Sequence, residues 1–554
     1  MIRLARPFSD GVIFQRGKPI LLWGNNDKAE RVRIRLNGET VAHAEIPAGV
    51  FSITLPPQEA TENAILEIGD VTLRHVDVGE VWIAGGQSNM EFFLEYTEGG
   101  DEEIASANDE HLRMYTVGQY SFAGERKLGY KAWNPWDKWL PYTPENAGSF
   151  SAVSVYFAKE LRRILGVPVG IISCNWGGTS ASAWLDRRYL EEDPALRSYI
   201  DDFDALVAKL DLERYNKIKA LVRPGMASRE AREQMGLFNK YTYRPGELEK
   251  LMMTGAGQQD AAAAQSNPLV GLSIADIMAV GPGDPNEPGT LYENMLKEIV
   301  GYPAKGVIWY QGETDEPKAE LYAKLFAAMR DCWLDAWQAR NPAQDALPFL
   351  TVQLAPFGTW RGSTGERFPI VREQQKLAAK TLSDVYMTSI SDLGNVFDIH
   401  PKVKQPVGER LALLARKYVY GEDKLSADAP KAADVIRDGD SLRISFVNCE
   451  GLAIRPASFE SYNGFPVEEI PENLLPPMLG GVNGLRVIVD GEALTDAECS
   501  VSYASLLIRT PAIREAQFVR IEFAQTGFYQ VNLFNGAGIP AKPFILEIGG
   551  KDHA

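Results

Sequence analysis

Five short apolar runs, each followed by small or polar residues, constrain the fold of this chain more than any other feature. These runs lie in the segments EVWIAGG, VGIISCNW, KGVIWY, PFLTVQLAPF and DVYMTSISDLG. Helical sequence alternates with them, most clearly AELYAKLFAAMRDCWLDAW, whose apolar residues recur at three- and four-residue steps. Continuous apolar strands that alternate with helices indicate a parallel sheet covered on both faces. Such sheets place reactive groups at the carboxyl ends of their strands.

Both ends of the chain are expected to form β-structure instead. Near the start, RVRIRLNGETVAHAEI alternates charged and apolar residues and contains Asn37-Gly38, a pair typical of a type I′ hairpin turn. From about residue 429, the segments SLRISF, LRVIVDGEAL, ECSVSYASLLIRTP and FVRIEFAQ have strand character again. We therefore predict an α/β domain over 77–428, flanked by β-sandwich regions over 1–76 and 429–554.

Residues 201–285 interrupt the alternation of strands and helices. This segment begins with the charged helical sequence DDFDALVAKLDLERYNKIKALV and ends in AGQQDAAAAQSNP, a low-complexity tract that resembles a linker. We interpret the segment as an insertion in the α/β domain that could flank its functional site. A chain of 554 residues is too long for one hydrophobic core, so several domains are expected.

Charge and cysteine content exclude several classes of partner. The formal net charge of −17 argues against nucleic acids and anionic membranes, because both require basic patches. No C-x-x-C spacing is present, so we expect buried thiols rather than a zinc site or disulfides at Cys174, Cys332, Cys449 and Cys499. The start, MIRLARPFSDGVIF, lacks the apolar core of a signal peptide, and no run is long enough to span a membrane. We therefore expect a cytoplasmic protein.

His400 is the histidine best placed to act as a general base near neutral pH. It follows an apolar strand, precedes an amphipathic helix and has Asp398 as a neighbour in SISDLGNVFDIHPKVKQPVGERLALLA. The other histidines lie in the N-terminal β region, at the start of an expected strand or in the tail: His43, His75, His111 and His553.

Ser88 lies where the apolar run of VGEVWIAGGQSNMEFF ends and a helix is expected to begin. A strand-to-helix turn exposes a serine hydroxyl and brings backbone N–H groups close to it, as a nucleophile requires. The G-x-S-x-G signature is absent, and the position alone favours a simple helix N-cap. Two other strand ends carry similar residues, Gly177-Gly178 in NWGGTSASAW and Gln311 with Glu313 in WYQGETD. Together with His400, these strand ends indicate a reactive site.

Several motifs resemble those of one known family. They are GEVWIAGGQSNME, GSFSAVSVYFAKEL, NWGGTSASAWL, LYENM followed by GVIWYQGETD, and DLGNVFDIHPKVKQPVGERLAL, with RPFSDGVIFQRGKPILLWG and NLFNGAGIPAKPF near the two ends. The chain resembles the sialate O-acetylesterase group of the SGNH hydrolases over nearly its whole length, except for the insertion. The resemblance implies a flavodoxin-like α/β/α catalytic domain and a carbohydrate O-acetylesterase activity.

The resemblance also implies roles for individual residues. Ser88 matches the nucleophile and His400 the base. The expected oxyanion donors are the backbone N–H groups of Ser88 and Gly178 and the side chain of either Gln311 or Asn89. Gln87 and Asn89 flank the nucleophile on its two sides. Many SGNH hydrolases have an aspartate three residues before the histidine, where this chain has Phe397. The acid is therefore assigned first to Glu313 of the Q-G-E block, then to Asp398, and last to Asp392.

Aromatic and cationic residues could bind a sugar. Packing is the more frequent role of tryptophan, but Trp133, Trp136 and Trp139 could stack on sugar rings, and the glycine block carries Trp176 and Trp184. Arg372 could pair with the carboxylate of a sialate or form a buried salt bridge.

We therefore expect a serine esterase that removes O-acetyl groups from carbohydrates, most directly from sialates, without a metal ion or organic cofactor. One alternative is the same chemistry on acetylated xylan, xyloglucan or mannan fragments. The other is a carbohydrate-binding protein without catalytic activity, which would leave Ser88, His400 and Gln311 without a reason to lie at strand ends. The sequence does not indicate the oligomeric state.

Overall fold

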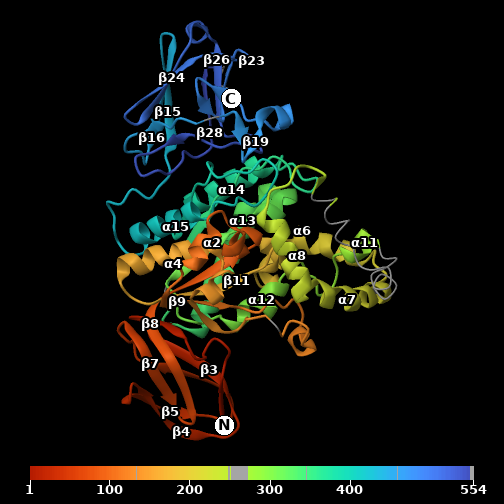
Figure 1. Cartoon of the computed structure of the whole chain (residues 1–554), viewed down its shortest axis with the longest axis vertical. Coiled ribbons are helices and arrows are strands. Elements are labelled where there is room, and N and C mark those ends of the chain that lie inside the picture. Colours follow the sequence, from red (N-terminus) through yellow and green to blue (C-terminus); the bar gives the residue numbers. More distant parts are fainter. Residues whose placement is uncertain (133, 248–249, 251–272, 345, 458, 550–554) are drawn as a thin grey trace.

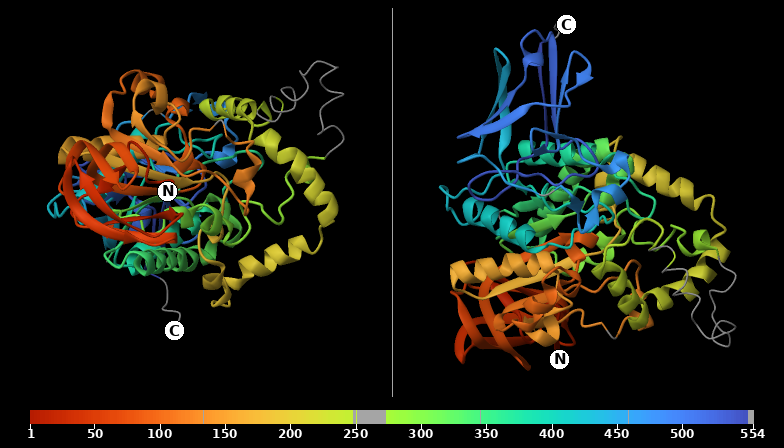
Figure 2. Two further views of the ribbon diagram at one scale, coloured as in Figure 1. Left: turned by 90° about the horizontal axis from the view of Figure 1, so that it is seen from below. Right: turned by 45° about the horizontal axis from the view of Figure 1, so that its top comes forward.

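The computed structural model describes residues 1–132, 134–247, 250, 273–344, 346–457 and 459–549. An N-terminal β region, a central α/β part and a C-terminal β region follow one another along the long axis of the molecule (Figure 1). Figure 2 shows the same order from another side, with the helices of residues 197–240 projecting beside the central part. Within the described residues, no helix is both long and apolar enough to cross a lipid bilayer.

The central sheet has six parallel strands and one antiparallel edge strand. Their order in space is β10 (Trp139–Tyr142), β9 (Asp109–Thr116), β11 (Val169–Asn175), β8 (Val71–Gly86), β12 (Gly306–Tyr310), β13 (Phe349–Val352) and β14 (Val385–Thr388). This arrangement agrees with the parallel sheet predicted from the apolar runs. The chain places β9 and β11 on one side of β8 and the later strands on the other. Ligands of such sheets bind at the carboxyl ends of strands where the order reverses, here the end of β8.

Helices cover both faces of this sheet. The long ones are α4 (Ala152–Leu165), α13 (Tyr322–Arg340), α14 (Phe368–Thr381) and α15 (Gln405–Tyr418). Helices α4 and α15 pack together on one face, where Phe157 meets Trp82 of β8 edge-on with ring centroids 5.1 Å apart. Helix α13 lies on the other face beside α14. There a Cβ on Gly85 would lie 2.8 Å from Trp309 and 3.2 Å from Trp333, so glycine is needed for this close packing.

The N-terminal region shares a strand with the central sheet. Its other strands are β1 (Ile2–Leu4), β2 (Ile13–Gln15), β3 (Ile20–Asn26), β4 (Glu30–Leu36), β5 (Glu39–Ile46), β6 (Gly49–Leu55) and β7 (Thr61–Ile68). Asn37 and Gly38, with φ of 51° and 81°, form the predicted two-residue turn between β4 and β5. Strand β8 pairs with β2 and β7 in this region and then continues into the central sheet. The strand therefore runs through the predicted domain boundary between residues 76 and 77.

The predicted insertion contains helices over much of its described length. It contains α6 (Arg197–Val207), α7 (Leu212–Met226), α8 (Arg229–Lys240) and α11 (Ile274–Ile277). The linker-like tract at 256–268 lies outside the described residues. The last turn of α8 reaches the loop that follows β14, because Lys402 Nζ donates a hydrogen bond of 2.5 Å to the Asn239 carbonyl. The insertion therefore contacts the loop that carries His400.

The C-terminal region has the β-structure predicted from residue 429 onward. One antiparallel sheet has the order β15 (Lys431–Asp438), β16 (Ser441–Val447), β25 (Ser505–Arg509) and β24 (Glu498–Ser502). A second has the order β23 (Glu492–Ala493), β22 (Leu485–Val489), β26 (Phe518–Phe523) and β28 (Phe544–Gly549). Their buried residues, including Ile444 and Ile508 of the first sheet and Val487 and Ile521 of the second, form one hydrophobic cluster.

Short elements complete the described chain. Two-stranded ribbons are formed by β17 (Ala453–Ile454) with β27 (Leu533–Phe534), β18 (Ser461–Tyr462) with β19 (Phe465–Pro466), and β20 (Met478–Leu479) with β21 (Val482–Asn483). The short α-helices are α1 (Ser88–Glu91), α2 (Gly100–Ala105), α3 (Pro144–Ala147), α5 (Arg187–Glu191) and α12 (Thr290–Asn294). The 3-10 helices are η1 (Leu94–Tyr96), η2 (Glu125–Leu128), η3 (Ala181–Ala183), η4 (Leu296–Glu298), η5 (Glu313–Leu321), η6 (Val467–Glu469), η7 (Glu472–Leu474) and η8 (Pro511–Ile513).

Candidate active site

A sharp turn at the end of β8 presents Ser88. Gly86 has φ of 138°, and a Cβ there would lie only 2.1 Å from the Tyr310 carbonyl oxygen, so no other residue fits. The Gln87 N–H donates to the same carbonyl at 3.1 Å, and the Gln87 side-chain oxygen accepts from the Thr314 N–H at 3.3 Å. These contacts fix the turn against β12 and η5. Ser88 is then the first residue of α1 and is partly exposed.

Ser88, His400 and Asp398 form a hydrogen-bonded array. Ser88 Oγ lies 2.9 Å from His400 Nε2, and His400 Nδ1 lies 2.9 Å from Asp398 Oδ1. The imidazole is held between the rings of Phe92, stacked at 5.7 Å, and Trp360, edge-on at 5.2 Å. The two strand ends that carry the serine and the histidine thus meet, although 312 positions separate them in the chain.

The acid beside His400 is Asp398, and the preference for Glu313 is wrong. Asp398 Oδ1 also accepts a hydrogen bond of 2.9 Å from the backbone N–H of His400. This local turn directs the carboxylate back toward the imidazole, which a two-residue spacing in extended chain would not do. Glu313 instead accepts from Asn89 Nδ2 at 2.6 Å.

Burial and nearby charges set the ionisation of the pair. Burial raises the pKa of Asp398, but the Lys402 ammonium 2.6 Å away and the hydrogen bond from His400 outweigh it, so the pKa lies below its usual value. Burial, assisted by Lys402 and Lys404, lowers the pKa of His400 despite the opposing effect of Asp398. At neutral pH the array therefore holds an ionised carboxylate and a neutral imidazole, which can accept a proton.

Asn89 fastens the nucleophile turn to two other loops. Its Nδ2 donates to Glu313 and, at 3.1 Å, to the carbonyl of Ile399, the residue before His400. Its Oδ1 accepts from Lys404 Nζ at 2.5 Å. Both amide hydrogens thus have protein partners in this structure, and the oxyanion role of this side chain stays a prediction. Burial lowers the pKa of Lys404 to about 7 and raises that of Glu313.

The glycine loop after β11 lies directly against the serine. A Cβ on Gly177 would lie 3.3 Å from Ser88 Cβ, and the Gly177 N–H donates to Glu91 Oε2 at 2.6 Å. Gly178, with φ of 73°, faces open space, and its carbonyl accepts from Asn286 at 3.0 Å. The loop therefore packs on Ser88 through Gly177, whose N–H is already occupied.

Gln311 supports the glycine loop. Its Nε2 donates to the Thr179 carbonyl at 3.1 Å and to Asp315 Oδ2 at 2.6 Å, while its Oε1 accepts from the Tyr322 hydroxyl at 3.1 Å. Both amide hydrogens have protein partners here, and the role of Gln311 as an oxyanion donor stays a prediction. Asp315 continues this network by accepting from the Ser180 hydroxyl at 2.6 Å.

A pocket opens beside the histidine loop. It encloses about 390 Å³, part of it open to solvent. It is lined by Phe238, Tyr243, Arg244, Pro245, Thr359, Trp360, Arg361, Gly362, Phe397 and Asp398. Residues 238–245 come from the insertion, so this segment forms one wall. Trp360 belongs both to the pocket and to the imidazole contact, which places the pocket next to the reactive array.

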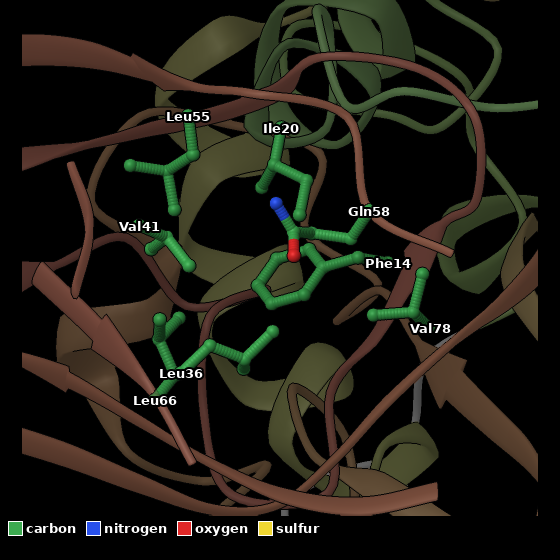
Figure 3. Close-up of a pocket in the computed structure, with 8 residues that line it drawn as sticks. All are labelled: Phe14, Ile20, Leu36, Val41, Leu55, Gln58, Leu66 and Val78. Atoms are coloured by element: carbon green, nitrogen blue, oxygen red, sulfur yellow. The ribbon is translucent and has the colours of Figure 1, made fainter. Parts of the chain in front are cut away.

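A second cavity lies inside the N-terminal β region and has a different character. Figure 3 shows its lining by aliphatic side chains and Phe14, with the Gln58 amide as the polar group. This lining contains no acid, base or nucleophile, so the cavity belongs to the apolar core of that region.

Arg372 contacts the C-terminal region. It is buried, donates from Nη2 to the Thr526 carbonyl at 2.6 Å, and lies 4.9 Å from the ring centroid of Tyr529. No carboxylate of the described residues forms an ion pair with it. The guanidinium packs under the C-terminal region, so the prediction of a buried salt bridge is wrong for the described residues, and sialate recognition by Arg372 stays a prediction.

Most of the candidate tryptophans pack in the protein. Trp139 donates to the Pro7 carbonyl at 2.8 Å, and Trp184 donates to Thr179 Oγ1 at 3.0 Å; both are buried. Trp136 meets Tyr120 edge-on, and Trp133 lies outside the described residues. Trp176 follows β11 and is partly buried under the Lys131 ammonium, 5.0 Å from its ring centroid.

Asp392, the last candidate for the acid, pairs with both terminal nitrogens of Arg410 at 2.7 Å and is unavailable to His400.

The sequence analysis did not identify Lys402, Lys404 and Trp360 as residues of the site. The two lysines lie in the same quoted histidine block, two and four residues after His400, and their charges next to Asp398 were the available signal. Trp360 had no such signal, because its loop lies about forty residues before the histidine. In the described part of the chain, no cluster of three or more His, Cys, Asp or Glu residues could hold a metal ion.

The fold and the site together define a class: an α/β protein with a serine, histidine and aspartate array at the carboxyl edge of a parallel sheet, the arrangement found in serine hydrolases. Residues 271–416 match the family model described as carbohydrate esterase, sialic acid-specific acetylesterase. The chain is 24% identical to the sialate O-acetylesterase of Rattus norvegicus over 460 residues, which cover 77% of this chain and 75% of the rat protein. It is also 24% identical to the Homo sapiens sialate O-acetylesterase over 461 residues, 77% of this chain and 73% of the human protein.

A solved structure supports the same relationship. The crystal structure of a carbohydrate acetylesterase from Xanthomonas citri superposes with a TM-score of 0.67 and 26% identity, covering 99% of both chains. The chain is thus similar to the sialate O-acetylesterases among the carbohydrate esterases, and the resemblance predicted from its motifs is confirmed.

Proposed function

We propose that this protein is a serine esterase that removes O-acetyl groups from carbohydrates, with O-acetylated sialic acid as its leading substrate. The observation that carries the proposal is the pair of 2.9 Å contacts linking Ser88 Oγ, His400 and Asp398. The similarity to carbohydrate acetylesterases supports the reaction class.

In the proposed first step, His400 Nε2 takes the Ser88 proton while Ser88 Oγ attacks the carbonyl carbon of the acetyl ester. The negative charge that forms on the carbonyl oxygen is held by the backbone N–H groups of Ser88 and Gly178. In this structure the Asn89 and Gln311 side chains donate to protein partners instead. Asp398 stabilises the imidazolium that forms. Loss of one oxyanion donor typically costs about 10²–10³-fold in turnover.

The tetrahedral intermediate then collapses. The C–O bond to the sugar breaks, the sugar oxygen takes the proton from His400, and an acetyl-serine remains. Water attacks this ester while His400 takes its proton, and acetate leaves as the Ser88 Oγ–carbon bond breaks and His400 returns the proton to Ser88 Oγ. Every proton in this scheme moves between Ser88, His400, water and the sugar, so the scheme needs no other chemical group.

The sugar would occupy the pocket that adjoins the histidine loop. Trp360 offers an aromatic face for a sugar ring. Two guanidinium groups, those of Arg244 and Arg361, line the same pocket. Arg244 is paired with Glu469 at 2.5 Å, and Arg361 lies over the Trp360 ring at 5.3 Å. Arg361 forms no ion pair among the described residues, so its charge favours an acidic sugar over a neutral one, which is why sialic acid is placed first.

We also propose the domain scheme behind this assignment. Residues 77–428 would be a flavodoxin-like SGNH hydrolase domain with an insertion at about 201–285. Residues 1–76 and 429–554 would be flanking β-sandwich regions that support it. The parallel order around β8 and the two antiparallel sheets of the C-terminal region support this scheme.

The test is acetate release from a panel of substrates by the wild-type protein and by Ser88→Ala. The panel contains 9-O-acetyl sialate and acetylated xylan, xyloglucan and mannan oligosaccharides at equal acetyl concentration. We expect the sialate to be cleaved fastest and Ser88→Ala to lose about 10⁴-fold or more in turnover. If a neutral oligosaccharide is cleaved fastest, that oligosaccharide replaces sialate as the proposed substrate, and the proposed esterase reaction stands. Sugar binding without acetate release by the wild-type protein would contradict the esterase proposal.

A further inference from the structure

The second carboxylate oxygen of Asp398 has a partner of its own. Asp398 Oδ1 contacts His400, whereas Oδ2 accepts a hydrogen bond of 2.6 Å from Lys402 Nζ. The Asp398 side chain is 5% exposed and the Lys402 side chain 12%. Charged pairs shielded to this degree are held in a fixed geometry, because release of either partner leaves a buried charge uncompensated.

The same ammonium is anchored in the insertion. Lys402 Nζ donates a hydrogen bond of 2.5 Å to the Asn239 carbonyl. Asn239 lies in the last turn of α8, where carbonyl groups lack intrahelical partners and the helix dipole favours a cation. The ammonium also lies 5.2 Å from the ring centroid of Phe92, which stacks on His400. One cation therefore joins the insertion, the carboxylate and the packing of the imidazole.

We propose that Lys402 is a positioning residue for the hydrolytic array, and that it couples α8 of the insertion to the orientation of Asp398 and His400. The expected effects on kcat rest on the proposed function. The link from α8 through Lys402 to Asp398 and His400 does not depend on it. It gives the insertion a function beyond forming a wall of the pocket: the end of α8 fixes the cation that fixes the acid.

The ammonium also belongs to the electrostatic surroundings of His400. Its positive charge disfavours the imidazolium, while Asp398 favours it. Removal of this cation should raise the pKa of His400, so that a larger fraction is protonated at neutral pH. The other charged or titratable groups around the array come from several elements: Lys404 at the start of α15, Glu313 of η5, Glu91 of α1, Tyr310 of β12, and Arg244 and Arg361 of the pocket.

The first test compares Lys402→Met with the conservative Lys402→Arg. We expect Lys402→Met to lower kcat about 10- to 100-fold with a smaller change in KM, because the reacting groups lose their alignment. We also expect the acidic limb of the kcat/KM profile to move to higher pH by about one unit. Lys402→Arg should restore most of kcat and the position of the limb. A merely structural lysine would change the amount of folded protein and leave the pH profile unmoved.

The matched control is Lys417→Met. Lys417 Nζ pairs with Asp428 Oδ2, also at 2.6 Å, and both side chains are largely shielded, at 23% and 17% exposure. This pair lies outside the reactive array, so kcat and the pH limb should stay at wild-type values. An unchanged kcat and pH profile in Lys402→Met would overturn the inference.

A readout without turnover separates this inference from the proposed function. The chain has five histidines, so selective isotope labelling allows the His400 ring to be titrated by NMR, with His400→Asn for assignment. We expect the His400 pKa to rise in Lys402→Met and to be unchanged in Lys417→Met. If the wild-type protein releases no acetate and this shift is seen, the proposed function fails and the positioning role stands. If acetate is released but the pKa of His400 does not move, the positioning role fails alone.

The coupling to α8 is tested with a glycine pair in the insertion. A Cβ on Gly236 of α8 would lie 2.9 Å from the Tyr96 ring, so Gly236→Val forces the helix and this ring apart, whereas the Cβ of Gly225 in α7 would meet nothing within 4 Å. We expect Gly236→Val to lower kcat and Gly225→Val to leave it unchanged. In the Lys402→Met background, Gly236→Val should have little further effect, because the link is already broken. Equal losses in both backgrounds would contradict coupling through Lys402.

Discussion

At the scale of single residues, the array depends on one carboxylate that contacts three donors. Asp398 accepts from the backbone and the ring of His400 with one oxygen and from Lys402 with the other. Each contact fixes a different degree of freedom: the turn of the loop, the orientation of the imidazole and the rotation of the carboxylate. The pKa of this acid is held below its usual value, so it remains ionised throughout the range in which an imidazole can act as a base.

The assignment of the acid predicts unequal losses in two matched variants. Asp398→Asn keeps the size of the side chain but removes the charge that stabilises the imidazolium, so kcat should fall about 10³–10⁴-fold. In Glu313→Gln the side chain can still accept a hydrogen bond from Asn89, and position 313 is not a partner of His400. We therefore expect kcat to fall by less than about tenfold. Steady-state kinetics on p-nitrophenyl acetate measures both. A larger loss in Glu313→Gln would restore Glu313 as the acid.

The ionisation of His400 predicts activity at mildly acidic pH. Burial lowers the pKa of this imidazole, so the neutral, proton-accepting form persists below the ordinary histidine value of about 6.5. The kcat/KM of the wild-type protein should therefore stay near its maximum as pH falls from 7 to about 6.5 and decline only below that value. Because kcat/KM reports the free enzyme, the limb should be the same for p-nitrophenyl acetate and an acetylated sugar. A limb above pH 7 would contradict the direction of the shift.

At the scale of elements, the site is held by side chains that tie strand ends to one another. Asn89 joins α1 to the start of η5 and to the histidine loop, and Gln311 joins the end of β12 to the glycine loop. Both amides have every hydrogen engaged. Elements that meet at the edge of a parallel sheet have no mutual backbone pairing, so such side chains supply the fixed geometry that catalysis requires.

Removal of the Asn89 junction should affect turnover more than binding. In Asn89→Leu, Glu313 and Lys404 lose their common partner, and the Ile399 carbonyl beside His400 is released. We expect kcat to fall about 10²-fold with little change in KM, because the serine and the histidine lose their relative placement. Asn294→Leu is the control, since the Asn294 amide donates to the Thr290 carbonyl at 2.8 Å and its loss leaves the Asn89 junction intact. A loss in Asn89→Leu that appears in KM alone would show that Asn89 contacts substrate.

Element by element, the sequence predicted what depends on local pattern. Continuous apolar runs identified the parallel strands, and Asn37-Gly38 identified a hairpin turn, because both follow from backbone and burial alone. Several partners of the Asn89 and Gln311 side chains could not be predicted, because Glu313, Lys404 and Thr179 lie more than one hundred residues away from them in the chain. The preference for Glu313 over Asp398 failed for another reason: it assumed a spacing rule, whereas the backbone turn at His400 decides where the carboxylate points.

At the scale of the whole molecule, the β regions are joined to the central part through buried polar contacts. Arg372 reaches from α14 to Thr526 and Tyr529 of the C-terminal region. At the other end, Glu80 of β8 accepts from Arg16 at 2.6 Å and from Tyr420, which follows α15, at 3.0 Å. These contacts connect segments from both ends of the chain to the sheet that carries Ser88.

Glu80 tests how strongly the N-terminal region is coupled to the rest. The carboxylate is 2% exposed, and it also accepts from Gln15 at 3.2 Å, so Glu80→Gln removes the charge from three contacts while keeping the volume. Arg16 is one-third exposed and partly screened, so the free energy of unfolding should fall by only about 1–2 kcal/mol. A lower midpoint of the first transition in urea, followed by tryptophan fluorescence, would report this loss, while kcat stays at the wild-type value because Ser88, His400 and Asp398 keep their contacts. Glu67→Gln, on an exposed strand position paired with Arg35 at 3.8 Å, should leave the midpoint unchanged. Equal midpoints for Glu80→Gln and Glu67→Gln would mean that the shared strand β8 alone couples the two parts.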